Sequence, residues 1–227
     1  MSITQRPAQI DGTTSRSWLV PFLAIAFTVL FVAAFLGGNS GADKDTTGAE
    51  LIAKHAQSDT ATFLTSTAMI VAAIVLIFFG GWLRQTLRSA AARSDWLPDV
   101  AFAGAIMHAL TLALFVSSAK SVQDAIATGD PVVARALNIA DGNNFVIAML
   151  GLACVLIATG VSSFRSRALP RWLAVASIVL GVLAPLGPGG FVPFTLFPIW
   201  VIVVAFVASS NSRSQNPVTV RPSPGMH

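Results

Sequence analysis

The amino-acid sequence predicts an all-α integral membrane protein, a helical bundle of six transmembrane helices with both termini in the cytoplasm. Hydrophobic residues make up 54% of the chain and charged residues only 11%, whereas about 25% of the residues in a typical soluble domain are charged. Six apolar runs are separated by polar segments, and the basic residues concentrate in alternate segments. These observations indicate a chain whose main solvent is lipid.

The six apolar runs are close to the length of a membrane span. About 20 apolar residues, rising roughly 1.5 Å each in a helix, cross a hydrocarbon core of about 30 Å. The predicted spans are residues 18–36, 61–83, 97–118, 145–163, 172–186 and 191–207. The fifth run is short, Pro185 lies at its end, and the sequence GPGG follows it, which favours a tight turn. The last two helices therefore form a hairpin that either spans the bilayer or re-enters it.

The distribution of basic residues predicts the orientation. One side of a six-helix bundle receives ten of the 14 Lys and Arg residues, namely Arg6, Arg16, Arg84, Arg88, Arg93, Arg165, Arg167, Arg171, Arg213 and Arg221. The other side receives Lys44, Lys54, Lys120 and Arg135. Because cytoplasmic segments are enriched in Lys and Arg, we expect a cytoplasmic tail at residues 1–17, one transmembrane domain at 18–208 and a disordered cytoplasmic tail at 209–227.

The first and third loops, both on the outer side, are long enough for short amphipathic helices. In the first loop, Thr47 and Glu50 have the spacing of a capping box. In the third loop, Asp130 and Pro131 suit the N-cap and N1 positions of a helix, and Gly142 is placed to end it. The acidic residues of these loops, Asp141 among them, are interpreted as solvated.

One ionisable residue, His108, falls near the middle of a predicted span. Such a residue is costly in lipid and is therefore a functional candidate. The proposed polar site for a transported solute combines His108 with Thr111, Asn144, Thr65 and Thr67. In the alternative interpretation, His108 is a neutral packing residue bonded to a hydroxyl or a backbone carbonyl, and the other side chains make interhelical hydrogen bonds.

Small residues around His108 predict close helix contacts. Ala101, Gly104 and Ala105 share its face of the third span, and Ala148 and Gly151 lie on a similar face of the fourth. In the sixth span, aromatic residues recur at intervals of three and predict an aromatic face, formed by Phe191, Phe194, Phe197 and Trp200.

A metal site is a further alternative that the sequence allows. Counting inward from the span ends puts His108 and Cys154 at about the same depth, and Met149 is a further soft donor of the kind that suits copper(I), while zinc also suits His and Cys. No complete ligand set is present, and no cofactor is predicted. Cys154 is the single cysteine, so an intramolecular disulfide and a CxxC motif are excluded.

Several function classes lack their required motifs. HExxH, GxSxG and GxxxxGK[ST] are absent from the sequence, which argues against zinc peptidases, elbow hydrolases and P-loop ATPases. The dispersed basic residues do not form the continuous patch that nucleic acid requires. The first hypothesis is a non-catalytic accessory, assembly or stress-related membrane component that binds lipid, other membrane proteins or a second copy. A small-solute or ion transporter is the alternative, and an intramembrane metal-dependent enzyme is third.

Three local sequences carry a resemblance to known proteins. They are LPRWL at residues 169–173, FPIW at 197–200 and LRQTL at 83–87. With these, nearly the whole chain resembles the small polytopic membrane proteins of high-GC Gram-positive bacteria whose families have no assigned function. The resemblance implies a helical bundle in a bacterial inner (plasma) membrane, and it implies no catalytic or binding residue.

Overall fold

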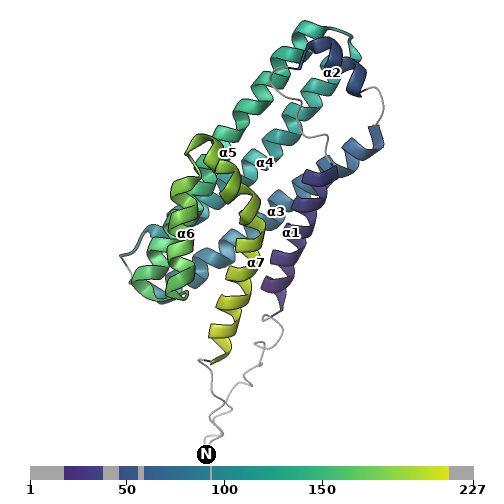
Figure 1. Cartoon of the computed structure of the whole chain (residues 1–227). Coiled ribbons are helices and arrows are strands. Elements are labelled where there is room, and N and C mark those ends of the chain that lie inside the picture. The colour runs from purple at the N-terminus through teal and green to yellow at the C-terminus, as the bar shows by residue number, and fades with distance from the viewer. Residues whose placement is uncertain (1–17, 38–45, 56–58, 93, 215–227) are drawn as a thin grey trace, which may run out of the picture.

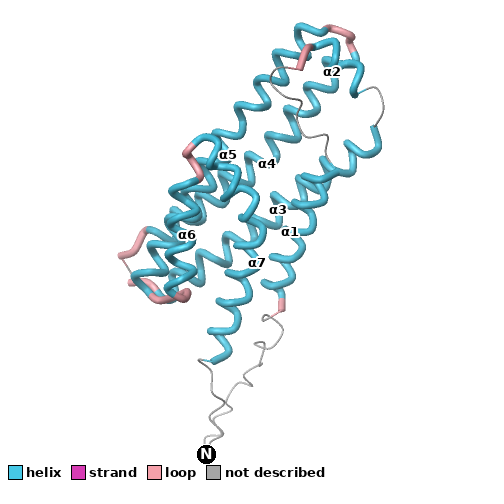
Figure 2. The backbone as a smooth tube through the Cα atoms, in the orientation of Figure 1, coloured by secondary structure: helices cyan, strands magenta, loops and turns pink. Residues whose placement is uncertain are grey.

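The structure is a computed structural model of the chain and describes residues 18–37, 46–55, 59–92 and 94–214. Within these ranges the regular elements are all helical and no strand occurs (Figure 2). In order they are α1 (Leu19–Gly37), α2 (Gly48–His55), α3 (Asp59–Ala90), α4 (Leu97–Ala127), α5 (Pro131–Ser166), α6 (Arg171–Leu183), a 3-10 turn (Gly187–Gly190) and α7 (Phe191–Ser214). The predicted all-α class is confirmed.

Five helices, α1, α3, α4, α5 and α7, contain a segment long and apolar enough to cross a membrane. They coincide with five of the six predicted spans and indicate a multi-pass membrane protein. The sixth, α6, has 13 residues, which is only about 20 Å of helix. Gly187 follows at φ 58°, a left-handed conformation that suits glycine, so the tight turn predicted between the last two helices is present.

Successive long helices are neighbours, and α7 returns to α1. Ring contacts fix the direction of α7: Phe27 lies 5.9 Å from Phe197, and Phe31 lies 5.4 Å from Phe194, centroid to centroid. The residue numbers of the contacting rings rise along α1 while they fall along α7, so the two helices are antiparallel. The last residues of α7 therefore lie at the end of the bundle where α1 begins, as Figure 1 shows.

The α4–α5 hairpin is longer than the rest of the bundle (Figure 1). The prediction of a separate outer helix that ends at Gly142 is wrong. Instead, α5 runs unbroken through this residue as one helix of 36 residues. The predicted cap at its start is confirmed, since Asp130 accepts hydrogen bonds from the Val132 and Val133 amides. Burial of Ala134 and Asn138 shows that packing continues along this extension, which favours continued helix over a glycine stop.

The short helix predicted in the first loop is present. In α2, the Thr47 amide donates to Glu50 Oε2 over 2.9 Å, and the Glu50 amide lies 3.3 Å from Thr47 Oγ1. This reciprocal pair is the expected capping box. The helix packs on the first part of α5, at the far end of the long hairpin (Figure 1).

Candidate functional site

His108 is completely buried between α4 and α5. Its Nδ1 atom lies 3.1 Å from the backbone oxygen of Ala148. A carbonyl oxygen can only accept a hydrogen bond, so Nδ1 carries the proton, and in the neutral ring Nε2 holds a lone pair. That Nε2 atom has no hydrogen-bond partner among the described residues. The ring is therefore satisfied on one side and unsatisfied on the other.

Two glycines allow the backbones to approach closely at His108. An ideal Cβ on Gly151 would lie 2.7 Å from the backbone nitrogen of His108, and one on Gly104 would lie 2.5 Å from that of Val155. Both distances are too short for a real side chain. The small-residue faces predicted on these two spans thus pack against each other within one chain.

An aromatic wall from α7 closes the histidine site. The His108 ring lies edge-on to Phe197 at 5.0 Å and to Phe194 at 6.2 Å, centroid to centroid. Phe145 of α5 contacts Phe194 at 5.5 Å. The predicted aromatic face of α7 is confirmed at Phe194, Phe197 and Trp200, which are buried, whereas Phe191 is 57% exposed. Two aromatic rings of α7 therefore pack against the imidazole.

The hydroxyls of the predicted transport site donate to their own helices. Thr111 bonds to the Met107 oxygen over 2.8 Å, Thr67 to that of Phe63 over 2.8 Å, and Thr65 to that of Thr62 over 3.1 Å. Such bonds to a preceding turn are the usual way for a hydroxyl to be satisfied in a membrane helix. The structure thus gives each threonine a local partner.

Asn144 belongs to a polar cluster between α4 and α5. Its Nδ2 donates to Ser118 Oγ over 3.1 Å, and Ser118 in turn donates to a carboxylate oxygen of Asp141. Sequence reasoning treated Asp141 as a solvated loop residue and so missed this cluster. The available signal was the three-residue spacing of Asp141 and Asn144, which puts both on one helix face once α5 is continuous.

The three weak metal candidates face different neighbours. Cys154 lies beside Gly104, whose ideal Cβ would be 2.8 Å from the cysteine Cβ, and Met149 Sδ faces Gly190 of the α6–α7 turn. Gly104 precedes His108 by four residues, which is about 6 Å along α4. In the part of the chain described, no group of three or more His, Cys, Asp or Glu side chains is placed to hold a metal ion.

Two further buried hydroxyls have no partner within the described ranges, those of Thr159 and Ser163 on α5. They lie one turn apart, on the half of α5 that leads from His108 toward the arginine-rich end. Near that end, Ser162 Oγ is 3.5 Å from Asp95 Oδ2. The sequence did not single out these hydroxyls, because serine and threonine in a span are commonly satisfied by their own helix.

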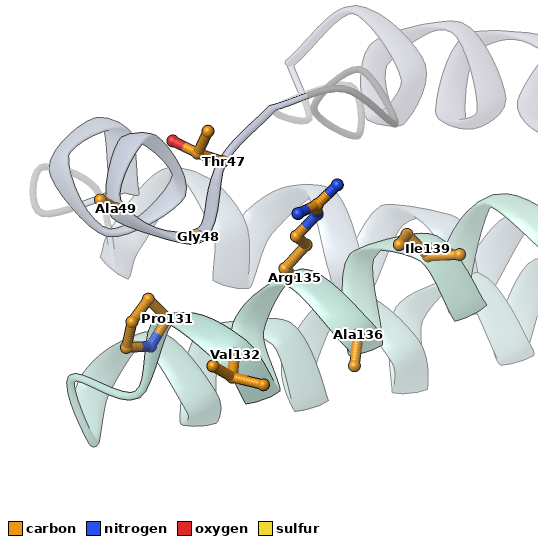
Figure 3. Close-up of a pocket in the computed structure, with 8 residues that line it drawn as sticks. All are labelled: Thr47, Gly48, Ala49, Pro131, Val132, Arg135, Ala136 and Ile139. Carbon is orange, nitrogen blue, oxygen red and sulfur yellow. The ribbon is translucent and has the colours of Figure 1, made fainter.

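A cavity of about 460 Å³ lies between the start of α2 and the start of α5. Figure 3 shows Arg135 among its lining residues, between Thr47 on one side and Ile139 on the other. The rest of the lining is largely apolar, from Gly48, Ala49, Pro131, Val132 and Ala136. This cavity is separate from His108.

Comparisons with known proteins add no family to this description. No family model matches the chain, and no match was found among curated proteins or solved structures. The arrangement itself defines the class: a helical bundle with several helices apolar enough to span a membrane, and with the buried His108 between α4 and α5.

Proposed function

We propose that the protein is a non-catalytic component of a bacterial plasma membrane, with six spans and both tails in the cytoplasm, and that it serves an accessory, assembly or stress-related role. The proposal includes α6 with its following turn as the sixth crossing. The antiparallel pairing of α1 and α7 supports it, because an even number of crossings returns the chain to its starting side.

The single observation that carries the non-catalytic reading is the bond from His108 to Ala148. A midplane histidine that donates to a backbone carbonyl across a glycine seam joins two helices. The imidazole thus serves packing, and the rings of Phe194 and Phe197 lie against it. Contacts with lipid or with other membrane proteins then fall to the outward faces of the bundle, where apolar side chains such as Val29, Phe78 and Leu110 are at least 60% exposed.

His108→Leu tests this proposal. Ala148 keeps its own helix partner, so the substitution removes one interhelical bond, worth about 0.6 kcal/mol on average in membrane proteins. We expect normal expression, a normal melting temperature in detergent and an unchanged phenotype in cells that depend on the protein. A specific loss of phenotype with intact folding would overturn the non-catalytic reading. His108→Phe, which keeps a ring of similar shape, is the matched control for packing.

A second candidate function is a small-solute or ion carrier, and the observation that favours it is the lone Nε2 of His108. Together with Thr159 and Ser163, this atom forms a set of three buried polar groups without partners in the described chain. A carrier needs such groups to be reached by water. In sealed vesicles, brisk reaction of Cys154 with a membrane-impermeant thiol reagent would support the carrier, and complete inertness would count against it.

A further inference from the structure

An apolar groove of about 900 Å³ runs along the outside of α6. Its floor and walls are formed by Val175, Ala176, Val179 and Leu180 of α6, Phe164 of α5 and Leu196 of α7. At the start of α6, Arg171 and Trp172 complete the lining. The groove therefore has one cationic, amphipathic end, and the remainder of its lining is hydrocarbon.

The length of the groove along α6 matches the thickness of one membrane leaflet. Its α6 lining runs from Arg171 to Leu180, which is nine residues of rise, or about 14 Å. Half of a hydrocarbon core is about 15 Å. Trp172 is 60% exposed beside Arg171, and tryptophan prefers the headgroup level. This places Arg171 at the phosphate level and Leu180 near the midplane.

The arginines around this end lack acidic partners. Among the described residues, no ion pair involves Arg165, Arg167 or Arg171. The neighbouring basic pair differs, because Arg84 and Arg88 both contact Asp99, at 2.6 and 2.5 Å. Asp99 thus offsets part of the positive charge of Arg84 and Arg88, whereas no described carboxylate pairs with the arginines of the α5–α6 connection.

We infer that this groove binds an anionic phospholipid, with the phosphate on Arg171 and one acyl chain along α6. A basic site at the end of transmembrane helices suits an anionic headgroup, and a phosphate can accept two parallel hydrogen bonds from a guanidinium. The apolar lining matches an acyl chain, which needs no hydrogen bonds. The binding does not depend on the proposed cellular role, and vesicles with the lipid in both leaflets present it to either end of the bundle.

Quenching of Trp172 fluorescence by brominated lipids tests the inference. The full chain is reconstituted into phosphatidylcholine vesicles that contain phosphatidylglycerol or phosphatidylcholine with brominated acyl chains, which quench tryptophan on contact. The Trp172 signal is the difference between the wild type and Trp172→Phe. We expect the relative association constant from quenching to favour the anionic lipid about fivefold, the gain that one nearby arginine provides. Arg171→Gln should abolish most of this preference.

A second variant tests the acyl-chain part of the groove. Ala176→Phe fills its middle and should lower Trp172 quenching by the anionic lipid while leaving the fold intact by circular dichroism. Arg135→Gln, a cation in the other cavity, and Val146→Phe, on an exposed face of α5, are the matched controls and should change nothing.

Three outcomes would overturn the inference. Equal quenching by the two brominated lipids means that the groove does not select anionic lipid. Retention of the preference in Arg171→Gln means that the phosphate lies elsewhere. Absence of quenching by either lipid is the result expected if a second copy or another protein covers the groove.

Discussion

Gly151 of α5 lies directly against the backbone of His108 on α4, so close that an ideal Cβ would be 2.7 Å from the histidine nitrogen. This contact sets the spacing of α4 and α5 and fixes which residues of α5 the imidazole can reach. Ala148, the hydrogen-bond acceptor, is one turn away on the same face.

Gly151→Ala should destabilise the protein by about 1–3 kcal/mol, the usual cost of forcing an extra methyl group into a packed interior. The methyl group has no flexible neighbour to displace, because backbone atoms of His108 and Gly104 surround it. Gly142→Ala, at an exposed position of the same helix, should instead stabilise by up to about 1 kcal/mol, since alanine is the better helix former. Equilibrium unfolding in mixed micelles measures both, and equal effects would contradict the proposed seam.

The sequence predicted most of the helices because their signals are local. Residues 97–118 and 145–163 are apolar enough to identify two spans, and the GPGG turn breaks the chain visibly. It could not predict how far α4 and α5 extend beyond them, because the extension depends on packing of Ala134 and Asn138 against neighbouring helices. A polar stretch with a glycine looks like a loop until its partner is known.

The candidate site was predictable only in part, for a related reason. His108 is conspicuous as a charge-capable residue in an apolar run, but its partner is a backbone carbonyl, which every residue possesses. Relative depth also failed as a guide to contact, since Cys154 lies against Gly104 and His108 lies against Gly151. Hydropathy boundaries do not set the register of two helices; the positions of the glycines do.

Removing the acceptor of the Trp200 indole should be costly. Trp200 of α7 donates from Nε1 to Ser177 Oγ of α6 over 2.8 Å, and both side chains are buried. Ser177→Ala leaves the indole N–H without a partner and should lower stability by about 1–3 kcal/mol. In a Trp200→Phe background, Ser177→Ala should lower stability only slightly. A double-mutant cycle with coupling near zero would contradict this tie, and Thr195→Ala, an exposed hydroxyl on α7, serves as the control.

The proposed orientation predicts opposite labelling of two single cysteines. In a Cys154→Ala background, Val132→Cys lies at the start of α5, where the native side chain is 75% exposed, and Ser89→Cys lies at the end of α3. The arginine-rich end should be cytoplasmic. An impermeant thiol reagent applied to intact cells should therefore label position 132 at once and position 89 only after permeabilisation. The reverse labelling pattern would show that the orientation is opposite to the proposed one.

Replacement of Arg167 with glycine should stabilise the folded protein. It ends α5 with φ 59° and ψ 26°, and its amide donates to the Ser163 oxygen. A side chain in this left-handed conformation costs roughly 1–2 kcal/mol, a cost that glycine avoids. Part of the gain is lost to the greater freedom of glycine in the unfolded chain, so Arg167→Gly should raise stability by up to about 1 kcal/mol.

The matched control for that change is Arg165→Gly, two residues earlier in the last turn of α5. This position is helical, so glycine should lower stability by about 0.5–1 kcal/mol. Both variants remove one positive charge from the same connection, and any difference between them in thermal melts therefore reports backbone conformation and not charge. If both variants shift the melting temperature in the same direction by the same amount, the left-handed strain at Arg167 contributes nothing measurable to stability.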